Sequence, residues 1–170
     1  MTREIRLPFL SILLVLSLAS GCASLKQTPE EKARIAQLVN QRLDEHRYQI
    51  NIDYMTPRRG SGKAVSYSYT LTVDGTVVDS HLPYAGVAYD VPYGGGKVLT
   101  FKDDIDEYAD SGWRKDRRTI AFSTNNEEDI IVYTLTVYEN GRVYIDVHCR
   151  NREDISYRGT LDPDSYPAAQ

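Results

Sequence analysis

Residues 130–149 read IIVYTLTVYENGRVYIDVHC, and this stretch decides the fold. Apolar and polar residues alternate on both sides of Asn140-Gly141, the pattern of two strands joined by a hairpin. A two-residue loop would mix apolar and charged side chains on each face. A three-residue loop with Gly141 left-handed pairs Tyr138 with Arg142 and gathers the apolar side chains on one face. The stretch therefore predicts an antiparallel pair joined by a bulged hairpin.

The same alternation continues outward from this hairpin in both directions. Thirteen tyrosines and many Val, Ile and Thr residues favour strands. Asp74-Gly75 fits a two-residue loop that pairs Val73 with Thr76. The expected strands are residues 49–54, 64–73, 76–82, 97–105, 117–123, 130–138, 142–150 and 155–161. Eight closely spaced strands predict a mainly β domain, a single eight-stranded antiparallel barrel or meander.

One helix precedes the first strand. Thr28 is the expected N-cap, Pro29 takes the first helical position, and Glu31 completes a capping box. Apolar residues then recur at helical spacing along a single stripe: Ile35, Leu38, Val39 and Leu43. We expect a helix over residues 28–46 that packs on the strands.

The first residues predict export. Arg3 and Arg6 precede an uncharged apolar run over residues 7–19, which is shorter than the about 20 residues that span a bilayer. Leu18-Ala19-Ser20-Gly21-Cys22 resembles the bacterial lipobox, which ends in a lipidated cysteine. The alternative is an uncleaved N-terminal anchor. The expected division is a signal peptide over 1–21, a lipidated tether over 22–27, the helix over 28–46, the β domain over 47–162 and a tail over 163–170.

Charge and cysteine content limit the partners. Without residues 1–21 the chain has 18 basic and 23 acidic residues, a net charge of −5, which argues against nucleic acid. We expect the lipid bilayer to be a partner through acylated Cys22. Cys149 is then unpaired, and its place on the apolar face of a strand favours a small buried hydrophobe over a catalytic thiol.

The segment 82–97 is the most unusual part of the chain. It holds Tyr84, Tyr89 and Tyr93, two prolines and a triple glycine. One interpretation is an aromatic loop at a barrel mouth that contacts a ligand together with inward-facing Tyr67 and Tyr69. The alternative, favoured for this segment, is an irregular edge whose tyrosines pack on the barrel. Gly94-Gly95-Gly96-Lys97 lacks the spacing and the following helix of a phosphate-binding loop.

Other polar motifs do not predict a catalytic centre. Asp79-x-His81 and Asp146-x-His148 would bind a metal only on neighbouring strands, so we expect solvated surface instead. The run Arg114–Arg118 is mixed in sign and indicates a solvated turn and strand entry. We therefore expect no catalytic residue, no metal site and no cofactor.

Several segments together resemble one family. These are Ile52–Gly60, Leu82–Lys97, Asn126–Asp129, Tyr133–Leu135 and Ile155–Leu161. They are similar to the bacterial family called domain of unknown function 4251, whose members are lipoproteins or secreted proteins of Bacteroides-like bacteria. The resemblance implies a lipocalin-like barrel and no assigned activity. In such bacteria surface lipoproteins carry acids just after the cysteine, and residues 23–27 have none. The expected location is the periplasmic side of the outer membrane, in preference to the inner membrane.

Three hypotheses for function follow. The leading one is a non-enzymatic envelope lipoprotein that binds a small apolar or glycan-like ligand through the barrel interior and the Tyr84–Tyr93 loop. The second is an envelope interaction protein with a fully packed barrel, which contacts a partner through an edge or the helix. The third is a hydrolase. Interior volume separates the first two, because large inward side chains leave no room for a ligand.

Overall fold

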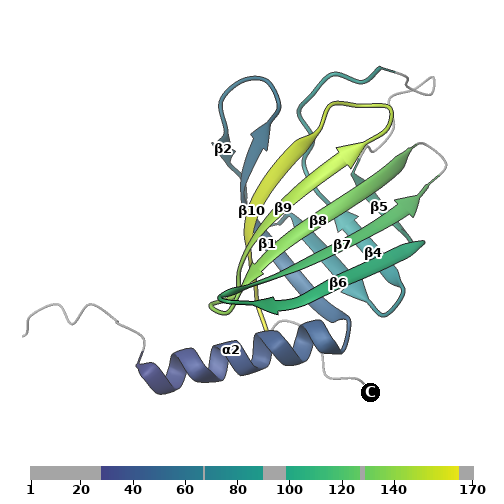
Figure 1. The fold of residues 1–170 in the computed structure, drawn as a ribbon. Helices are drawn as coiled ribbons and strands as arrows, with labels where there is room; N and C mark the ends of the chain where they lie inside the picture. The colour runs from purple at the N-terminus through teal and green to yellow at the C-terminus, as the bar shows by residue number, and fades with distance from the viewer. Residues whose placement is uncertain (1–27, 67, 90–98, 127–128, 165–170) are drawn as a thin grey trace, which may run out of the picture.

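The computed structural model describes residues 28–66, 68–89, 99–126 and 129–164, which form one helix and one antiparallel sheet (Figure 1). The elements are α2 (Pro29–Asp44), β1 (Arg47–Pro57), β2 (Lys63–Ala64), β3 (Thr70–Asp74), β4 (Val77–His81), β5 (Thr100–Asp104), β6 (Glu107–Arg114), β7 (Arg117–Asn125), β8 (Ile130–Tyr138), β9 (Arg142–Cys149) and β10 (Ile155–Leu161). Cys22 and the predicted tether lie outside the described residues.

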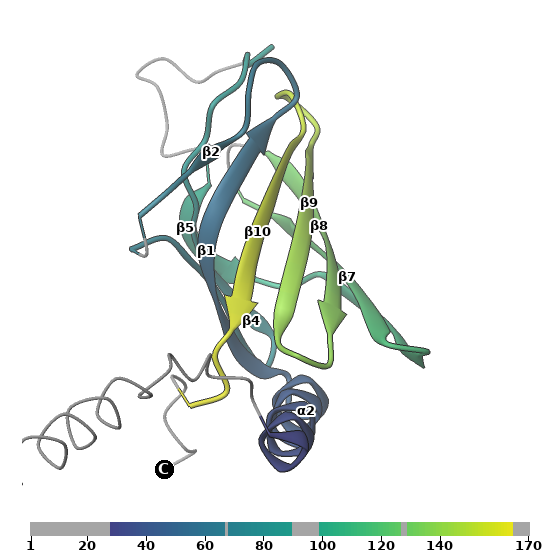
Figure 2. The same ribbon diagram turned by 90° about the vertical axis from the view of Figure 1, so that its left-hand side faces the viewer.

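The sheet is a curled half-barrel (Figure 2). Its strands follow the order β5-β4-β3-β1-β10-β9-β8-β7-β6, and β2 pairs with β1 outside this path. In a flat sheet the two ends, β5 and β6, would lie about 38 Å apart. Only Ile105 and Asp106 separate these strands in the chain, and such a link spans at most about 11 Å. The sheet must therefore curl until its two edges approach at this corner.

The bulged hairpin at Asn140-Gly141 is confirmed. Val137 pairs with Val143, the register that places Tyr138 opposite Arg142. Gly141 has a φ of 80°, and its N–H donates to the Tyr138 carbonyl at 2.9 Å. The inward side chains of β8 and β9 are all buried, and the outward ones alternate with them.

The loop at Asp74-Gly75 has the predicted length but a different position. Val73 pairs with Val78 rather than with Thr76, so the two loop residues are Gly75 and Thr76. Gly75 has a φ of 63°, which suits the first central position of a type II′ turn. Each side chain still lies on the face of the sheet that was predicted for it. The partner of Val73 moves by two residues, and side chains two apart on a strand point to the same face.

The structure has ten strands where eight were expected, and the ladder is not a closed barrel. Strand β6 was not predicted because a bulge between Asp110 and Trp113 interrupts its alternation. The predicted strand 64–73 is instead two elements, β2 and β3. The mainly β class and the predicted helix before the first strand are confirmed.

Helix α2 lies across one end of the half-barrel (Figure 1). Its predicted cap is present, since the Glu31 N–H donates to Thr28 Oγ1 at 3.2 Å, and Pro29 occupies the first turn. The helix ends two residues earlier than expected, at Asp44. Val39 and Leu43 are fully buried, so the apolar stripe packs on the strands. Among the described residues no helix is long and apolar enough to cross a membrane.

A buried arginine fastens the helix to the sheet. Arg118 is 7% exposed; it donates through Nε to both carboxylate oxygens of Asp110, at 3.0 and 2.9 Å, and through Nη1 to Asp44 at 2.6 Å. Trp113 Nε1 donates to Asn40 Oδ1 at 2.6 Å in the same cluster. The prediction that this part of the chain is solvated is thus wrong for Arg118. The sequence did not reveal its partners. Asp44 lies on α2, far from Arg118 in the chain, and Asp110 lies on β6, a strand that was not predicted.

Large side chains fill the concave side of the sheet. Tyr48, Phe122 and Tyr133 are at most 2% exposed, and the rings of Phe122 and Tyr133 stack at 4.9 Å. The Tyr133 hydroxyl donates to Ser80 Oγ at 3.1 Å, and Ser80 Oγ donates to the Leu99 carbonyl at 2.9 Å. The inward hydroxyl groups of Tyr133 and Ser80 therefore bond to one another and to backbone rather than lining an open space.

Cys149 belongs to this core, as predicted. Its side chain is buried and free, and 2% of the residue is exposed. Burial raises the pKa of its thiol to about 12, with a further contribution from the negative charge of Asp129. A thiol in this state is neither a nucleophile nor a metal ligand at neutral pH.

Candidate functional site

The predicted aromatic loop is fastened to the barrel over its described part. Tyr84 is half-buried, and its hydroxyl donates to the Glu153 carbonyl at 2.9 Å. Burial, followed by the charges of Cys149 and Glu153, raises the Tyr84 pKa to about 12. The Tyr157 hydroxyl donates to the Pro83 carbonyl at 2.7 Å. These bonds make the segment an irregular edge that supports the core, the alternative given for it above.

Of the other four predicted contact residues, the structure describes two, Tyr69 and Tyr89. Tyr89 is 64% exposed, and its backbone N–H donates to the Asn151 carbonyl at 2.8 Å. Tyr69 packs on the core and stacks on His81 with ring centroids 5.4 Å apart. Tyr67 and Tyr93, like the triple glycine, lie outside the described residues.

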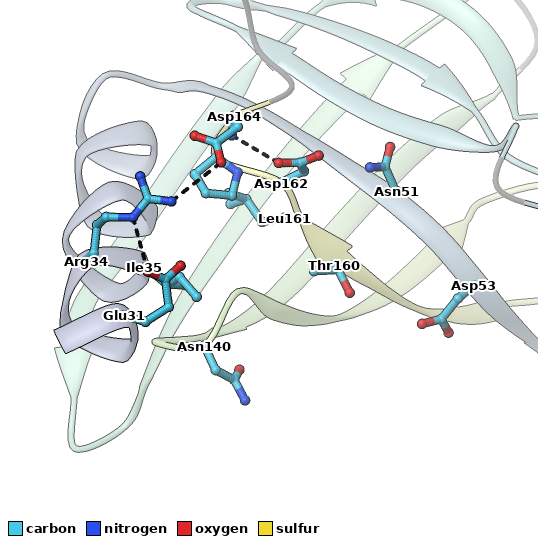
Figure 3. A pocket seen from close by; sticks show the side chains of 11 residues that line it. Glu31, Arg34, Ile35, Asn51, Asp53, Asn140, Thr160, Leu161, Asp162 and Asp164 are labelled. Carbon is cyan, nitrogen blue, oxygen red and sulfur yellow. Dashed lines mark hydrogen bonds and ion pairs between the residues drawn. The ribbon is translucent and has the colours of Figure 1, made fainter. Parts of the chain in front are cut away.

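A hollow of about 360 Å³ lies between α2, β1 and the end of β10 (Figure 3). Its polar lining comes from outward positions of the strands, Asn51, Asp53 and Thr160, together with Asn140 from the β8–β9 turn. On the helix side Arg34 pairs with Glu31 at 3.6 Å and with Asp164 at 4.0 Å. The remaining lining residues are Ile35, Leu161, Asp162 and Pro163.

A second hollow of about 380 Å³ continues along the convex face. It shares Asp53 and Thr160 with the first, and adds Arg142, Tyr144, Arg158 and Gly159. We call the two hollows together the outer groove. Strand register builds its wall, because Arg142 lies opposite Thr160 and Tyr144 lies opposite Arg158.

The charged and aromatic groups of the outer groove are held in place. Arg158 pairs with Asp53 at 2.9 Å, and its guanidinium lies 5.0 Å from the centre of the Tyr54 ring. Tyr144 is 42% exposed and meets Tyr138 edge-on at 6.0 Å. Gly159 stands at an inward position of β10, where a Cβ would approach the Asn51 carbonyl oxygen to 2.4 Å, so glycine at this position allows the backbones of β1 and β10 to lie close together.

Sequence reasoning did not single out the outer groove. Its strand residues occupy the polar half of the alternation, which is also the pattern of an ordinary solvated face. Two features distinguish the groove from an ordinary solvated face: β1, β10 and β9 are adjacent in the sheet, and α2 lies beside them. Both depend on contacts between segments far apart in the chain.

The two Asp-x-His pairs lie on β4 and β9, with β3, β1 and β10 between them in the sheet. His148 pairs instead with Asp154, Nδ1 to Oδ1, at 2.5 Å. Within the described ranges no three His, Cys, Asp or Glu side chains are grouped as metal ligands.

Comparison with known proteins places this fold in a family. The model of the family Domain of unknown function (DUF4251) matches residues 27–161. The chain belongs to the DUF4251 family. A crystal structure of a DUF4251 family protein from Bacteroides eggerthii DSM 20697 is similar in fold, with a TM-score of 0.54 and 14% sequence identity over 76% of this chain and 87% of that chain. No curated protein shows a significant match. The comparisons thus support the family resemblance and the fold, and assign no activity.

Proposed function

We propose that this DUF4251 protein is a non-enzymatic, lipid-anchored envelope protein that binds a polar, glycan-like ligand in the outer groove. One observation carries the proposal: the hollow lined by Asp53, Arg142, Tyr144, Arg158, Gly159 and Thr160 is mostly polar and lies on the convex face, while Tyr48, Phe122 and Tyr133 fill the concave side. The earlier expectation of an interior site beside the Tyr84–Tyr93 loop therefore gives way to an outer one, and an apolar ligand gives way to a polar one.

The chemistry of the outer groove suits a ligand rich in hydroxyl groups. Asn51 and Asn140 offer both donors and acceptors, Asp53 accepts, and Thr160 does both. Tyr144 supplies an exposed aromatic ring with a polar tip, the kind of side chain that packs on a sugar ring and also bonds to it. Asp53 and Glu31 are held in ion pairs with arginines, an arrangement for binding rather than for proton transfer.

The anchoring part of the proposal rests on the sequence. Cys22 ends the lipobox-like segment, and five neutral or basic residues separate it from Thr28. We place the protein on the periplasmic side of the outer membrane. Incorporation of a clickable palmitate analogue by wild type but not by Cys22→Ser tests the lipid. Digestion of the domain by protease added to intact cells would contradict the periplasmic location.

The ligand is tested by screening the lipid-free protein, residues 23–170, on an array of bacterial and host glycans, followed by calorimetric titration of the best hit. Tyr144→Ala should weaken binding roughly ten-fold, because an aromatic contact contributes about 0.5–1.5 kcal/mol beyond its buried area. Tyr89→Ala is the matched control, since Tyr89 is also exposed but lies outside the groove. Equal loss in both variants, or no loss in Tyr144→Ala, would refute the assignment of the groove.

A filled interior has its own test. The fluorescent probe N-phenyl-1-naphthylamine brightens in apolar cavities, so the lipid-free protein should not enhance its emission. Saturable enhancement that Tyr133→Trp abolishes, by adding bulk to the interior, would instead favour an interior apolar site.

A further inference from the structure

Two arginines line the second hollow of the outer groove, the one of about 380 Å³ on the convex face. Arg142 on β9 and Arg158 on β10 both occupy exposed positions that alternate with buried ones. Arg142 lies opposite Thr160, which is two residues along β10 from Arg158. Diagonal neighbours of this kind have Cβ atoms about 7–8 Å apart. Both guanidinium groups can therefore contact one small group bound in the hollow.

Arg142 differs from most arginines of this protein because no acid holds it. Ion pairs within 4.0 Å hold these described arginines: Arg34, Arg42, Arg47, Arg58, Arg59, Arg117, Arg118, Arg152 and Arg158. In the part of the chain that the structure describes, no carboxylate oxygen lies within that distance of the Arg142 guanidinium. The excluded acids include Glu139 and Asp146, the nearest ones along the chain on either side. Arg142 therefore presents an unpaired positive charge to the hollow that it lines.

Arg158 keeps most of its hydrogen-bonding capacity despite its ion pair. Its Nε–H donates to Asp53 Oδ1 at 2.9 Å, and the Tyr54 ring lies 5.0 Å from the centre of its guanidinium. Among the described residues neither Nη group donates to a protein acceptor, so the N–H donors of both Nη groups are available to a ligand. Asp53 thus orients the Arg158 guanidinium without using up its donors.

The charges of the outer groove are divided between its two hollows. Asp53, Arg142 and Arg158 are the charged residues that line the second hollow, two cations and one anion. The first hollow has the opposite balance, because Arg34 faces four acids there: Glu31, Asp53, Asp162 and Asp164. An anionic group is therefore attracted to the second hollow and repelled by the first. This difference gives a bound ligand a direction along the groove.

The groups around the two arginines suit an anion that belongs to a sugar. A guanidinium is a planar fork that donates two parallel hydrogen bonds to a carboxylate or a phosphate. Thr160, opposite Arg142, adds a hydroxyl donor, and Tyr144, opposite Arg158, adds an aromatic ring that is 42% exposed. The same face continues toward α2 through Asn51, whose amide can bond to sugar hydroxyl groups.

We propose that the ligand of the outer groove is an acidic glycan whose carboxylate or phosphate group is bound by Arg142 and by the Nη groups of Arg158. This inference rests on the proposed glycan function and adds the charge of the ligand and its orientation. The anionic group lies in the second hollow, and uncharged sugar hydroxyl groups extend over Asn51 and Asn140 toward α2.

An array of neutral, carboxylated and phosphorylated glycans tests the ligand class, with the full lipoprotein purified in a nonionic detergent. The strongest hits should be acidic, and the carboxylated and phosphorylated arms identify which anion is bound. The best acidic hit is then titrated by calorimetry beside its neutral counterpart, made by amidating the carboxylate or removing the phosphate. The acidic form should bind about ten-fold more tightly or better, because hydrogen bonds between charged groups are about twice as strong as neutral ones.

Substitution of Arg142 assigns the preference to this residue. Arg142→Gln should reduce the preference for the acidic form to about two-fold, since glutamine keeps a polar side chain but carries no charge. Arg114→Gln is the matched control, because Arg114 at the β6–β7 turn is also exposed and has no carboxylate within 4.0 Å among the described residues. It should keep the wild-type preference. A urea midpoint within error of wild type for each variant shows that the fold is retained.

The two proposals fail separately. Binding that Tyr144→Ala weakens, but that shows no preference for the acidic form, would overturn this inference and leave the proposed glycan function standing. An equal preference in Arg142→Gln and wild type would also overturn the inference alone. Absence of any hit on the array would overturn both.

Discussion

Replacing Arg118 by methionine should release α2 from the sheet. Methionine keeps much of the side-chain volume but removes every bond to Asp110, Asp44 and Asn40. Asp110, whose side chain is 18% exposed, would then be an uncompensated partly buried charge. Removing one partner of a fully buried ion pair costs about 3–5 kcal/mol, and because solvent reaches Asp110 we expect a smaller loss here, about 2 kcal/mol. The Asp44 contact alone counts for less, since that side chain is 55% exposed and such pairs contribute at most about 1 kcal/mol.

Urea denaturation followed by tryptophan fluorescence measures this loss of stability with a probe at the contact between α2 and the sheet. Trp113 is the sole tryptophan of the chain, and its indole N–H donates to Asn40 on α2. With a urea dependence of about 2 kcal/mol/M, Arg118→Met should lower the midpoint by about 1 M, and Asp44→Asn by less than about 0.5 M. Asp110→Asn, alone and combined with Arg118→Met, completes a double-mutant cycle. A cost below about 1 kcal/mol for Arg118→Met, or no coupling with Asp110, would refute the idea that the pair fastens the helix.

Three further outcomes are expected. Gly141→Ala should cost more than Gly75→Ala in urea midpoint, because both have positive φ but only at Gly141 would a methyl group meet backbone, the Leu161 carbonyl oxygen at 2.9 Å; equal costs would mean that strain alone decides. Cys149 should resist iodoacetamide in the native protein and react after unfolding, since burial raises its pKa to about 12; rapid native labelling would contradict this. Burial tends to raise the pKa of Asp110, but the bonds from Arg118 and Gly112 prevail and lower it below 3.8. Its stabilising effect is therefore present above that pH and lost as pH falls through the lowered pKa, so wild type should lose more stability in acid than Asp110→Asn.

Local patterns predicted those parts of the fold in which neighbouring residues decide the structure. The β8–β9 hairpin was predicted with its register, because a slip of one residue would bury charges beside Leu135 and Tyr133. The N-cap at Thr28 was predicted for a similar reason, since one side chain satisfies a nearby N–H group. Both features depend on residues close together in the chain.

The errors arise where that local information is ambiguous. Pairing Val73 with Thr76 or with Val78 puts the same residues on the same face, so alternation does not distinguish the two registers. In β6 the inward residues Tyr108 and Trp113 are five apart, an odd spacing that a bulge at left-handed Gly112 makes possible. Such a spacing contradicts the period of a regular strand.

The outer groove and the contact between Glu153 and Arg59 could not be predicted from local patterns, for a different reason. Asn51, Thr160 and Arg142 stand side by side only because β1 and β9 both pair with β10. Glu153 and Arg59 are likewise brought together from distant segments. Neither arrangement leaves a spacing or composition signal in any one stretch of sequence.

The last strand of the chain lies in the middle of the sheet. β10 pairs with β1 on one side and with β9 on the other, so among the described strands no backbone ladder joins β5-β4-β3-β1 to β9-β8-β7-β6 without it. The chain therefore has to be synthesised through residue 161 before the sheet becomes continuous. Until then β1 and β9 each present an open edge. A chain that stops short of Ile155 would leave two halves whose apolar faces are both exposed to aggregation.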